Sequence, residues 1–461
     1  MTERWNGAQE RADGSDVTGD MEHGTAEDVR EDVRRFVEAQ WALDITVREW
    51  WRRLAEAGLA MPAWPRPFGR AYPGSLARVV TEELAACGVI APPQGHLAVP
   101  LAGPTILEHG TAEQQARYLP PILRGEEAWC QLFSEPGAGS DLASLATRAV
   151  RDGHEWVVNG QKVWNSGADV ADRAMLLART DVDVPKHDGI TYFLLDMDQP
   201  GVEVRPLRQM NGEARFCEVF LTDARVEASD VLGGPGQGWR IARTTLRHER
   251  ASFAGRGPRG LVTVPSGTRA GFLDRSTGEA IGICGEGRSS RSDGRGRRGR
   301  RFDGNAVPPL ELVEIARERG VERDPHLRQL LARYYSLTQV NRFTQMRIRA
   351  AVAARRPVGP EGAISKLAMS RICHTSREVS FAILGASTML ADDDAPFSGD
   401  LQRVGLASFG TSIGGGTDEV QRNNVAEQTL GLPRDPGVDR GVPYRDLLVG
   451  TQASPPGSTP S

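Results

Sequence analysis

The spacing of apolar residues changes twice along the chain, and this limits the folds that it can adopt. From about Glu27 to Gly125 the apolar residues follow a helical period. From Gln131 to Val231 short β-prone runs follow one another, each bounded by Gly, Asp or Pro. Helical character returns at about Gln237. The sequence therefore predicts an α+β multidomain protein in which a β-domain separates two helical regions.

The predicted division of the chain follows these changes. We expect a disordered N-terminus (1–26), an N-terminal helical domain (27–130), a central β-barrel or β-sandwich domain (131–235), a C-terminal four-helix-bundle domain (236–435) and a tail (436–461). A Gly- and Arg-rich insertion at about 255–308 interrupts the C-terminal domain, and no helical or strand period is visible in it.

Local patterns predict individual elements within this division. Trp41, Trp50 and Trp51 are expected to anchor the first helical region. The run WVVNGQKVW predicts two short strands joined at Asn159–Gly160, because Asn-Gly is the strongest two-residue hairpin signal. Further helices are expected at Pro309–Leu390 and Thr417–Leu430.

Composition and charge exclude several classes of protein. The 461 residues carry a net charge of only -4, which indicates no particular partner. The five cysteines are far apart and contain no CxxC pair, which argues against a metal site or a disulfide framework and favours a reducing cytosol. No apolar run approaches the length of a membrane span, and the N-terminus does not resemble a secretory signal. A cytoplasmic protein is therefore expected.

The insertion contains a strongly basic stretch, Arg288–Arg301, with seven arginines in fourteen residues. A solvated loop is the favoured interpretation, and a surface for nucleic acid is the alternative. No aromatic residues are interleaved to stack on bases, so nucleic acid is an unlikely partner.

A glycine-rich turn begins the β-region. The stretch Trp129–Asp141 reads WCQLFSEPGAGSD, and Gly160–Asp169 reads GQKVWNSGAD about twenty residues later. Glycines such as Gly137 and Gly139 let the backbone approach a ligand closely. The hydroxyl of Ser140 is suited to donate to a phosphate oxygen. Taken alone, this stretch is typical of a turn rich in glycine and proline, and a contact with a cofactor is the alternative.

The second stretch contains a tryptophan, which taken alone would be interpreted as a core residue. Trp164 offers a flat apolar face, and Ser166, two residues later, lies on the same face of a strand. Together the two stretches resemble the signature of the acyl-CoA dehydrogenase family, T/S-E-P-x-A-G-S-D followed by G-x-K-x-W-x-T/S. The resemblance extends from about residue 30 to residue 435.

This resemblance implies bound FAD and α,β-dehydrogenation of an acyl-CoA thioester to the 2-enoyl-CoA. In that reaction a carboxylate removes the α-proton, and the β-hydrogen leaves as hydride to flavin N5. The residues that the resemblance assigns to FAD are Gln131, Phe133, Ser134, Gly139, Ser140, Trp164, Ser166, Thr417 and Glu419. Those that it assigns to the substrate are Ser140, Arg250 and Gly416. It also implies an electron-transfer flavoprotein as electron acceptor and a homo- or hetero-oligomer, either a dimer or a tetramer.

The catalytic base requires a separate assignment. Many members of the family carry a glutamate near the C-terminus, at the position where this chain has Gly415. A minority places the base on the helix after the β-domain, and the resemblance then assigns it to Glu249. The spacing of Ala242, Leu246, Glu249 and Phe253 predicts one stripe of that helix, in which Glu249 is the charged residue.

An alternative interpretation of Glu249 stays open. Arg243, Arg247 and Arg250 form a neighbouring stripe with the same spacing. In this interpretation Glu249 is an ordinary helix carboxylate paired with one of these arginines. The base assignment depends on the resemblance and on the glycine at position 415.

Two family elements that reach across a subunit interface are missing. An R-x-x-F-G element is absent, and Arg323 or Arg328 are the candidates to replace it. A Q-I-x-G-G-x-G element is replaced by Ala382–Thr388, which retains one glycine. Their absence motivates one alternative to a dehydrogenase, a non-catalytic subunit of a mixed complex. An oxidase is a second alternative, and the basic stretch Arg288–Arg301 motivates a third, a nucleic-acid-associated relative.

Overall fold

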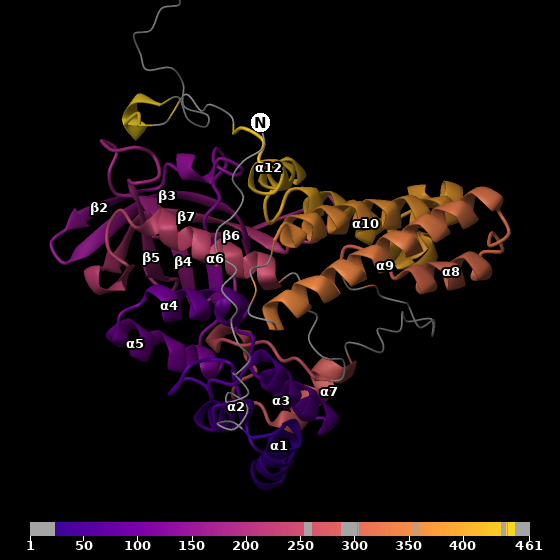
Figure 1. The fold of residues 1–461 in the computed structure, drawn as a ribbon, viewed down its shortest axis with the longest axis horizontal. Coiled ribbons are helices and arrows are strands. Elements are labelled where there is room, and N and C mark those ends of the chain that lie inside the picture. Colours follow the sequence, from indigo (N-terminus) through magenta and orange to yellow (C-terminus); the bar gives the residue numbers. More distant parts are fainter. Residues whose placement is uncertain are drawn as a thin grey trace, which may run out of the picture.

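The computed structural model describes residues 24–252, 261–286, 302, 304–353, 356, 359–434, 439 and 441–447. Figure 1 shows three parts: N-terminal helices at the bottom, a β-domain above them, and C-terminal helices that extend to the side. This arrangement confirms the predicted order of helices, strands and helices. The basic stretch Arg288–Arg301 lies outside the described residues, so its predicted role as a loop or a nucleic-acid surface stays untested.

The N-terminal part consists of short helices packed around two tryptophans. Its elements are α1 (Ala26–Gln40), α2 (Val47–Glu56), α3 (Gly74–Ala86), the π-helix η1 (Ala98–Ala102), α4 (Gly103–His109) and α5 (Ala112–Leu123). Trp50 and Trp51 are fully buried, and their indole nitrogens donate to the carbonyls of Ile90 and Ala91 at 2.9 and 2.8 Å. Replacing either ring by alanine is expected to cost about 3–5 kcal/mol. The prediction that tryptophans anchor the region is confirmed for Trp50 and Trp51, while Trp41 is partly buried and packs its ring against that of Trp50, with centroids 4.7 Å apart.

The β-domain is a single open sheet, which corresponds to the sandwich alternative and not to a closed barrel. Its strands are β1 (Trp129–Leu132), β2 (Arg148–Asp152), β3 (Glu155–Ser166), β4 (Arg173–Arg179), β5 (Ile190–Asp196), β6 (Val202–Leu207), β7 (Phe216–Glu227) and β8 (Val231–Leu232). The strand order is β6-β7-β3-β2-β4-β5-β8, and β1 pairs in parallel with β4. The short helices η2 (Leu142–Ser144) and η3 (Ala228–Asp230) lie in its connections.

The central strands are buried on both faces. Along β4, Leu176 and Ala178 belong to the core of the β-domain, while Met175 and Leu177 belong to the core shared with the N-terminal helices. Successive side chains of a strand point to opposite faces, so one continuous apolar run serves both cores. The site described below therefore lies on a rigid scaffold.

The predicted hairpin at Asn159–Gly160 is wrong. β3 runs without a turn from Glu155 to Ser166, and the hairpin with β2 closes around Gly153 instead. Asn159 bonds across to Asp223 of β7 at 3.0 Å, and a Cβ at Gly160 would lie 2.8 Å from the Cα of Thr147. The glycine thus permits a close approach between neighbouring segments, which local turn statistics do not detect.

The prediction of an insertion without regular structure is also wrong over part of its length. After α6 (Gly238–Ser252), the described residues 261–286 contain η4 (Thr268–Ala270) and α7 (Thr277–Glu286). This segment returns to the N-terminal helices: Val47 N donates to Arg275 O at 3.0 Å, and Ala91 N donates to Val262 O at 2.9 Å. Leu261, Val264, Leu273 and Ala280 are buried in the N-terminal core.

The regular elements among the described residues of the C-terminal part are all helices. It contains α8 (Pro309–Glu318), α9 (Pro325–Ala353), α10 (Glu361–Leu384), η5 (Gly385–Met389), η6 (Asp392–Asp394), η7 (Pro396–Gly399), α11 (Asp400–Ala407), η8 (Ser408–Ser412) and α12 (Asp418–Gln428). Within the described residues, none of the helices is both long and apolar enough to cross a bilayer. Arg403 of α11 pairs with Glu213 in the β6–β7 loop at 2.9 Å, which joins the C-terminal helices to the β-domain.

Candidate active site

The two sequence motifs meet where β1 lies beside the end of β3. Asn165 Nδ2 donates to the carbonyl of Gln131 at 2.7 Å, and Val163 N donates to the carbonyl of Ser134 at 2.9 Å. Lys162 Nζ donates to the carbonyl of Phe133 at 3.0 Å. The structure therefore brings Gln131, Phe133 and Ser134 next to the strand that carries Trp164 and Ser166.

A buried ion pair holds this junction together. Lys162 is fully buried, and its Nζ lies 2.8 Å from Glu135 Oε1. Glu135 also accepts hydrogen bonds from the backbone nitrogens of Ala146 and Thr147 at 2.6 and 2.9 Å. Burial alone would raise the pKa of Glu135, but Lys162 and these donors outweigh it, so the pKa of Glu135 lies below its usual value. This ion pair was not predicted from the sequence. Both residues lie in the motifs, and two opposite charges in apolar stretches were the signal that could have predicted it.

Trp164 projects from the sheet into solvent. Its side chain is 59% exposed, whereas its neighbours Val163 and Asn165 are buried. Trp164 has a φ of +64°, and the β3–β7 register shifts between Lys162 and Asn165. Such a bulge redirects a side chain, and bulges are common beside active sites. An indole held outward in this way provides an open face for a planar ring.

The other predicted cofactor residues of the two motifs differ in their exposure. Gly139 and Ser140 are exposed in the turn after β1, and no atom lies within 4 Å of a Cβ built on Gly139. Ser166 is half-buried at the end of β3, and Phe133 is buried against Tyr192 with ring centroids 5.8 Å apart. This exposed aromatic face beside an open glycine turn fits an isoalloxazine ring with its phosphates.

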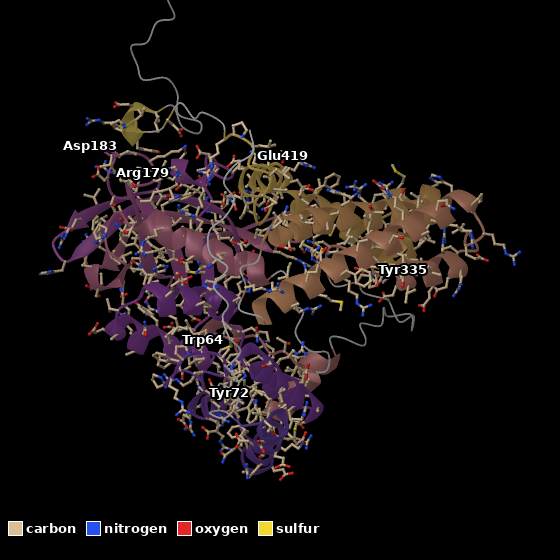
Figure 2. The ribbon with its side chains drawn as sticks, viewed as in Figure 1. Trp64, Tyr72, Arg179, Asp183, Tyr335 and Glu419 are labelled. Carbon is tan, nitrogen blue, oxygen red and sulfur yellow. The ribbon has the colours of Figure 1, made fainter. Side chains whose placement is uncertain are left out.

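The far end of that turn is fixed by the C-terminal segment. Lys186 is almost fully buried and pairs with Asp141 at 3.0 Å and with Asp439. The ring of Tyr444, in η9 (Tyr444–Asp446), lies 3.4 Å from the guanidinium carbon of Arg179. Figure 2 labels Arg179 near this segment. Residues remote in sequence thus support the turn that carries Ser140.

A second group of predicted residues lies at the start of α12. Thr417 is the N-cap, and its hydroxyl accepts from Val420 N at 3.3 Å. Gly416, with a φ of +84°, precedes it, and Glu419 is exposed and pairs with Arg422 at 3.2 Å (Figure 2). Among the described residues, no hydrogen bond joins this group to the β1–β3 junction. The structure therefore places the predicted cofactor residues in two groups.

The glycine loop before α12 contains a polar atom without a partner. Gln421 is buried; its Nε2 donates to Gly415 O at 3.1 Å, and its Oε1 has no hydrogen-bond partner within the described structure. A buried unpaired acceptor is costly, and it is a usual sign of a ligand or water that binds there. This observation also fits a bound cofactor beside Thr417.

Glu249 lies on α6, which packs against β5, η1 and α4. On its predicted stripe Ala242 is fully buried, Leu246 is partly buried and Glu249 is half-buried. Phe253 and the side chain of Arg250 lie outside the described residues, so their predicted positions stay untested.

The neighbouring arginine stripe faces solvent. Arg243 and Arg247 are exposed, and Arg247 pairs with Glu108 of α4 at 2.6 Å. The predicted stripe therefore contacts a carboxylate of the N-terminal helices. The sequence pattern on α6 did not identify Glu108 as this partner.

Buried hydroxyl groups fix the inner face of α6. Thr245 Oγ1 lies 3.0 Å from Thr105 Oγ1 of α4 and 3.1 Å from the Tyr192 hydroxyl of β5. His109 Nε2 lies 2.8 Å from Thr244 Oγ1. Fully paired buried polar groups specify one arrangement of the elements that carry them. They hold α6 in a fixed position between the N-terminal helices and the sheet.

Comparisons with known proteins agree with this geometry. The family models for acyl-CoA dehydrogenase match in three parts: the N-terminal domain over residues 24–126, the middle domain over 130–224 and the C-terminal domain over 310–430. Acyl-CoA dehydrogenase IpdE1 of Mycobacterium tuberculosis is 36% identical over 388 residues, which cover 84% of this chain and 88% of that protein.

Solved structures show the same architecture. The Tcur3481-Tcur3483 steroid ACAD is 27% identical with a TM-score of 0.63, and the match covers 89% of this chain and 98% of that one. The ChsE4-ChsE5 complex from Mycobacterium tuberculosis is 26% identical with a TM-score of 0.58, and the match covers 89% and 98%. The resemblance of the sequence motifs is thus confirmed over the whole fold, and this chain belongs to the acyl-CoA dehydrogenase family of flavoprotein oxidoreductases.

Proposed function

We propose that this chain binds FAD and catalyses α,β-dehydrogenation of an acyl-CoA thioester with Glu249 as the base. The observation that supports it most is the β1–β3 junction, where a buried ion pair joins the two motifs and Trp164 remains exposed. The indole of Trp164 makes an edge contact with Phe216, with ring centroids 5.9 Å apart, and its exposed surface suits a stacked ring.

In this proposal the described residues hold the cofactor from two sides. The turn and strand residues are Gln131, Phe133, Ser134, Gly139, Ser140, Trp164 and Ser166, and Thr417 and Glu419 belong to α12. FAD, when bound, supplies the acceptor for the substrate β-hydrogen. Ser140, Gly416 and Arg250 are proposed to contact the acyl-CoA.

Glu249 is proposed to accept the α-proton at its carboxylate. It lies on a regular helix between the N-terminal helices and the sheet, and the other residues of its described stripe are apolar. A carboxylate at the edge of an apolar stripe can be partly shielded from water, which favours its action as a base. The C-terminal position used by many relatives is Gly415, which has no side chain for this role.

The test of this assignment is Glu249→Gln. The variant is expected to keep FAD and its visible absorption, and to lose flavin bleaching by substrate by about 10²–10⁴-fold, the range for removal of a general base. Glu82→Gln is the control, because Glu82 is exposed on α3 and, within the part of the chain that the structure describes, its ion pair is with Arg78 at 3.3 Å. Bleaching of Glu249→Gln at the wild-type rate would show that another group is the base.

The proposed substrate is a ring-bearing acyl-CoA. The solved relative with the TM-score of 0.63 is a steroid ACAD, and the match covers 89% of the length of this chain. An anaerobic bleaching screen should therefore compare steroid-derived CoA thioesters with straight-chain ones. Faster bleaching by straight-chain thioesters alone would contradict this substrate class.

A second chain is proposed to complete the site. The two solved relatives described above are each named after two proteins. In this chain α9 exposes Val340, Phe343 and Met346 at helical spacing. Tyr335, also exposed, precedes them on the same helix (Figure 2). The candidates to replace the missing cross-subunit arginine are both exposed: Arg323 lies just before α9 and Arg328 lies in its first turn. These features support an assembly through the C-terminal helices, with an electron-transfer flavoprotein as the electron acceptor.

The same observations support one alternative function, a non-catalytic subunit of a mixed complex. Purification of the chain, alone and with candidate partners, distinguishes the proposed dehydrogenase from this alternative. The alternative predicts a colourless protein that stays inactive even when a partner restores the yellow colour. Turnover that releases hydrogen peroxide without an added acceptor would instead indicate an oxidase.

A further inference from the structure

The loop that leads into η1 contains a strained histidine. His96 has a φ of +56°, in the left-handed region that non-glycine residues rarely adopt, and Gly95 before it has a φ of +57°. The neighbouring backbone is fixed to β1, because Trp129 N donates to Gly95 O and Leu97 N donates to Trp129 O, both at 3.1 Å. Strain of this kind persists only where the surroundings impose it, and it is frequent at functional sites.

The imidazole of His96 lies directly on Gly167. A Cβ built on Gly167 would overlap Nε2 of the ring and lie 2.6 and 2.8 Å from Cδ2 and Cε1. Gly167 has a φ of +66° and follows Ser166, the last residue of β3. Glycine at position 167 thus leaves the space that the histidine ring occupies, and residues from two domains meet at the end of the cofactor strand.

Core packing does not explain this position. His96 is exposed, and within the described residues its ring makes no hydrogen bond and no ion pair. A ring held in a strained conformation at the surface, beside half-buried Ser166, is available to a bound molecule. The same loop contacts the end of β3 through His96 and leads to the helix of the proposed base. The helix η1 begins two residues after His96 and packs against α6.

We propose that His96 contacts the bound flavin, with an imidazole nitrogen hydrogen-bonded to the polar edge of the isoalloxazine ring on the side of Ser166. This inference rests on the proposed function. It makes the N-terminal domain a third contributor to the cofactor site, besides the β-domain and α12. It also couples the flavin to the helices that position α6.

The decisive variant is His96→Gly. Glycine adopts the left-handed conformation without strain, so this variant is expected to fold with an unchanged or higher melting temperature. It is nevertheless expected to bind FAD about 3- to 10-fold more weakly, the equivalent of one lost hydrogen bond. A purely structural role of His96 predicts the reverse combination, with lower stability and unchanged affinity.

The assay is titration of flavin-free protein with FAD, followed by flavin fluorescence and by the position of the visible absorption bands. His154→Gly is the matched control, since His154 is an exposed histidine in the β2–β3 turn, within the same domain as Gly167. His96→Asn, which tolerates the left-handed conformation and keeps a polar side chain, is expected to recover part of the affinity.

Two outcomes overturn the inference, and they are distinguishable. If wild-type protein, alone and with its partner chain, binds no FAD, the proposed function fails and the His96 inference fails with it. If wild-type protein binds FAD while His96→Gly and His154→Gly match it in affinity and absorption bands, only the His96 inference fails.

Discussion

Lys162→Met is the substitution that most directly tests the junction of the two motifs. Methionine preserves the unbranched stem of lysine but removes the charge that faces Glu135 at 2.8 Å. The side chain of Lys162 is fully buried, so water cannot replace the lost partner. The variant also removes the bond to the carbonyl of Phe133. Its effect therefore reports how strongly the ion pair holds the site.

The expected loss of stability follows from what remains around Glu135. Removing one partner of a buried pair typically costs about 3–5 kcal/mol, because the other charge stays buried. Glu135 keeps two backbone donors, from Ala146 and Thr147, so the lower end, about 3 kcal/mol, is expected. That corresponds to a decrease of the melting temperature on the order of 6–12 °C.

A double-mutant cycle separates the pair from its surroundings. Thermal unfolding should be followed for Lys162→Met, Glu135→Gln and the combined variant, with a coupling energy of at least about 2 kcal/mol expected. Arg225→Met is the control, since Arg225 forms exposed ion pairs with Asp152 and Glu155 in the same domain and should cost less than about 1 kcal/mol. Equal melting temperatures for Lys162→Met and Arg225→Met would refute the reasoning.

Three further outcomes follow from the same geometry. Trp164→Ala should weaken FAD binding about 2- to 10-fold in fluorescence titrations, since the stacked ring is worth about 0.5–1.5 kcal/mol, while Trp164→Phe should retain most of the affinity. Lys186→Met should remove the ion pair that attaches Asp439 of the C-terminal segment to Lys186, which also pairs with Asp141, and should speed cleavage of that segment in limited proteolysis; an unchanged cleavage rate would contradict the contacts. Folding lowers the pKa of Glu135. The ionised carboxylate therefore stabilises the folded state at pH values above the usual glutamate pKa of about 4.3, and this stabilisation is lost as the pH falls through the lower pKa that Glu135 has in the folded state. Melting temperatures measured between about pH 6 and pH 3 should therefore fall less steeply for Glu135→Gln than for wild type.

The sequence predicted those parts of the fold that depend on local periodicity. The C-terminal helices were predicted at Pro309–Leu390 and Thr417–Leu430, and the structure has α8, α9 and α10 in the first range and α12 in the second. Helical and strand spacing reflects which face of an element is buried, so it can be read from one sequence. The two motifs of the β-region were also predicted together, and hydrogen bonds join them in the structure.

The errors arose where a distant segment decided the local structure. Asn159–Gly160 is a strong turn signal, yet Thr147 packs against Gly160 and Asp223 pairs with Asn159, so the strand continues. The stretch 261–286 is glycine-rich and looked unstructured, but the N-terminal core accepts its few apolar residues. The contact between His96 and Gly167 joins positions far apart in the chain, and no spacing rule connects them.

The backbone at Gly415 gives a physical reason why the base would be on α6. Gly415 has a φ of +68°, so a glutamate there would adopt a strained left-handed conformation. Its carbonyl also accepts from Gln421, which fixes the loop in that conformation. Glu249 lies on a regular helix instead, where its backbone carries no such cost. In the proposed mechanism the position of the base therefore depends on how α6 packs against the N-terminal helices, through the contact of Thr245 with Thr105, and not on the loop before α12.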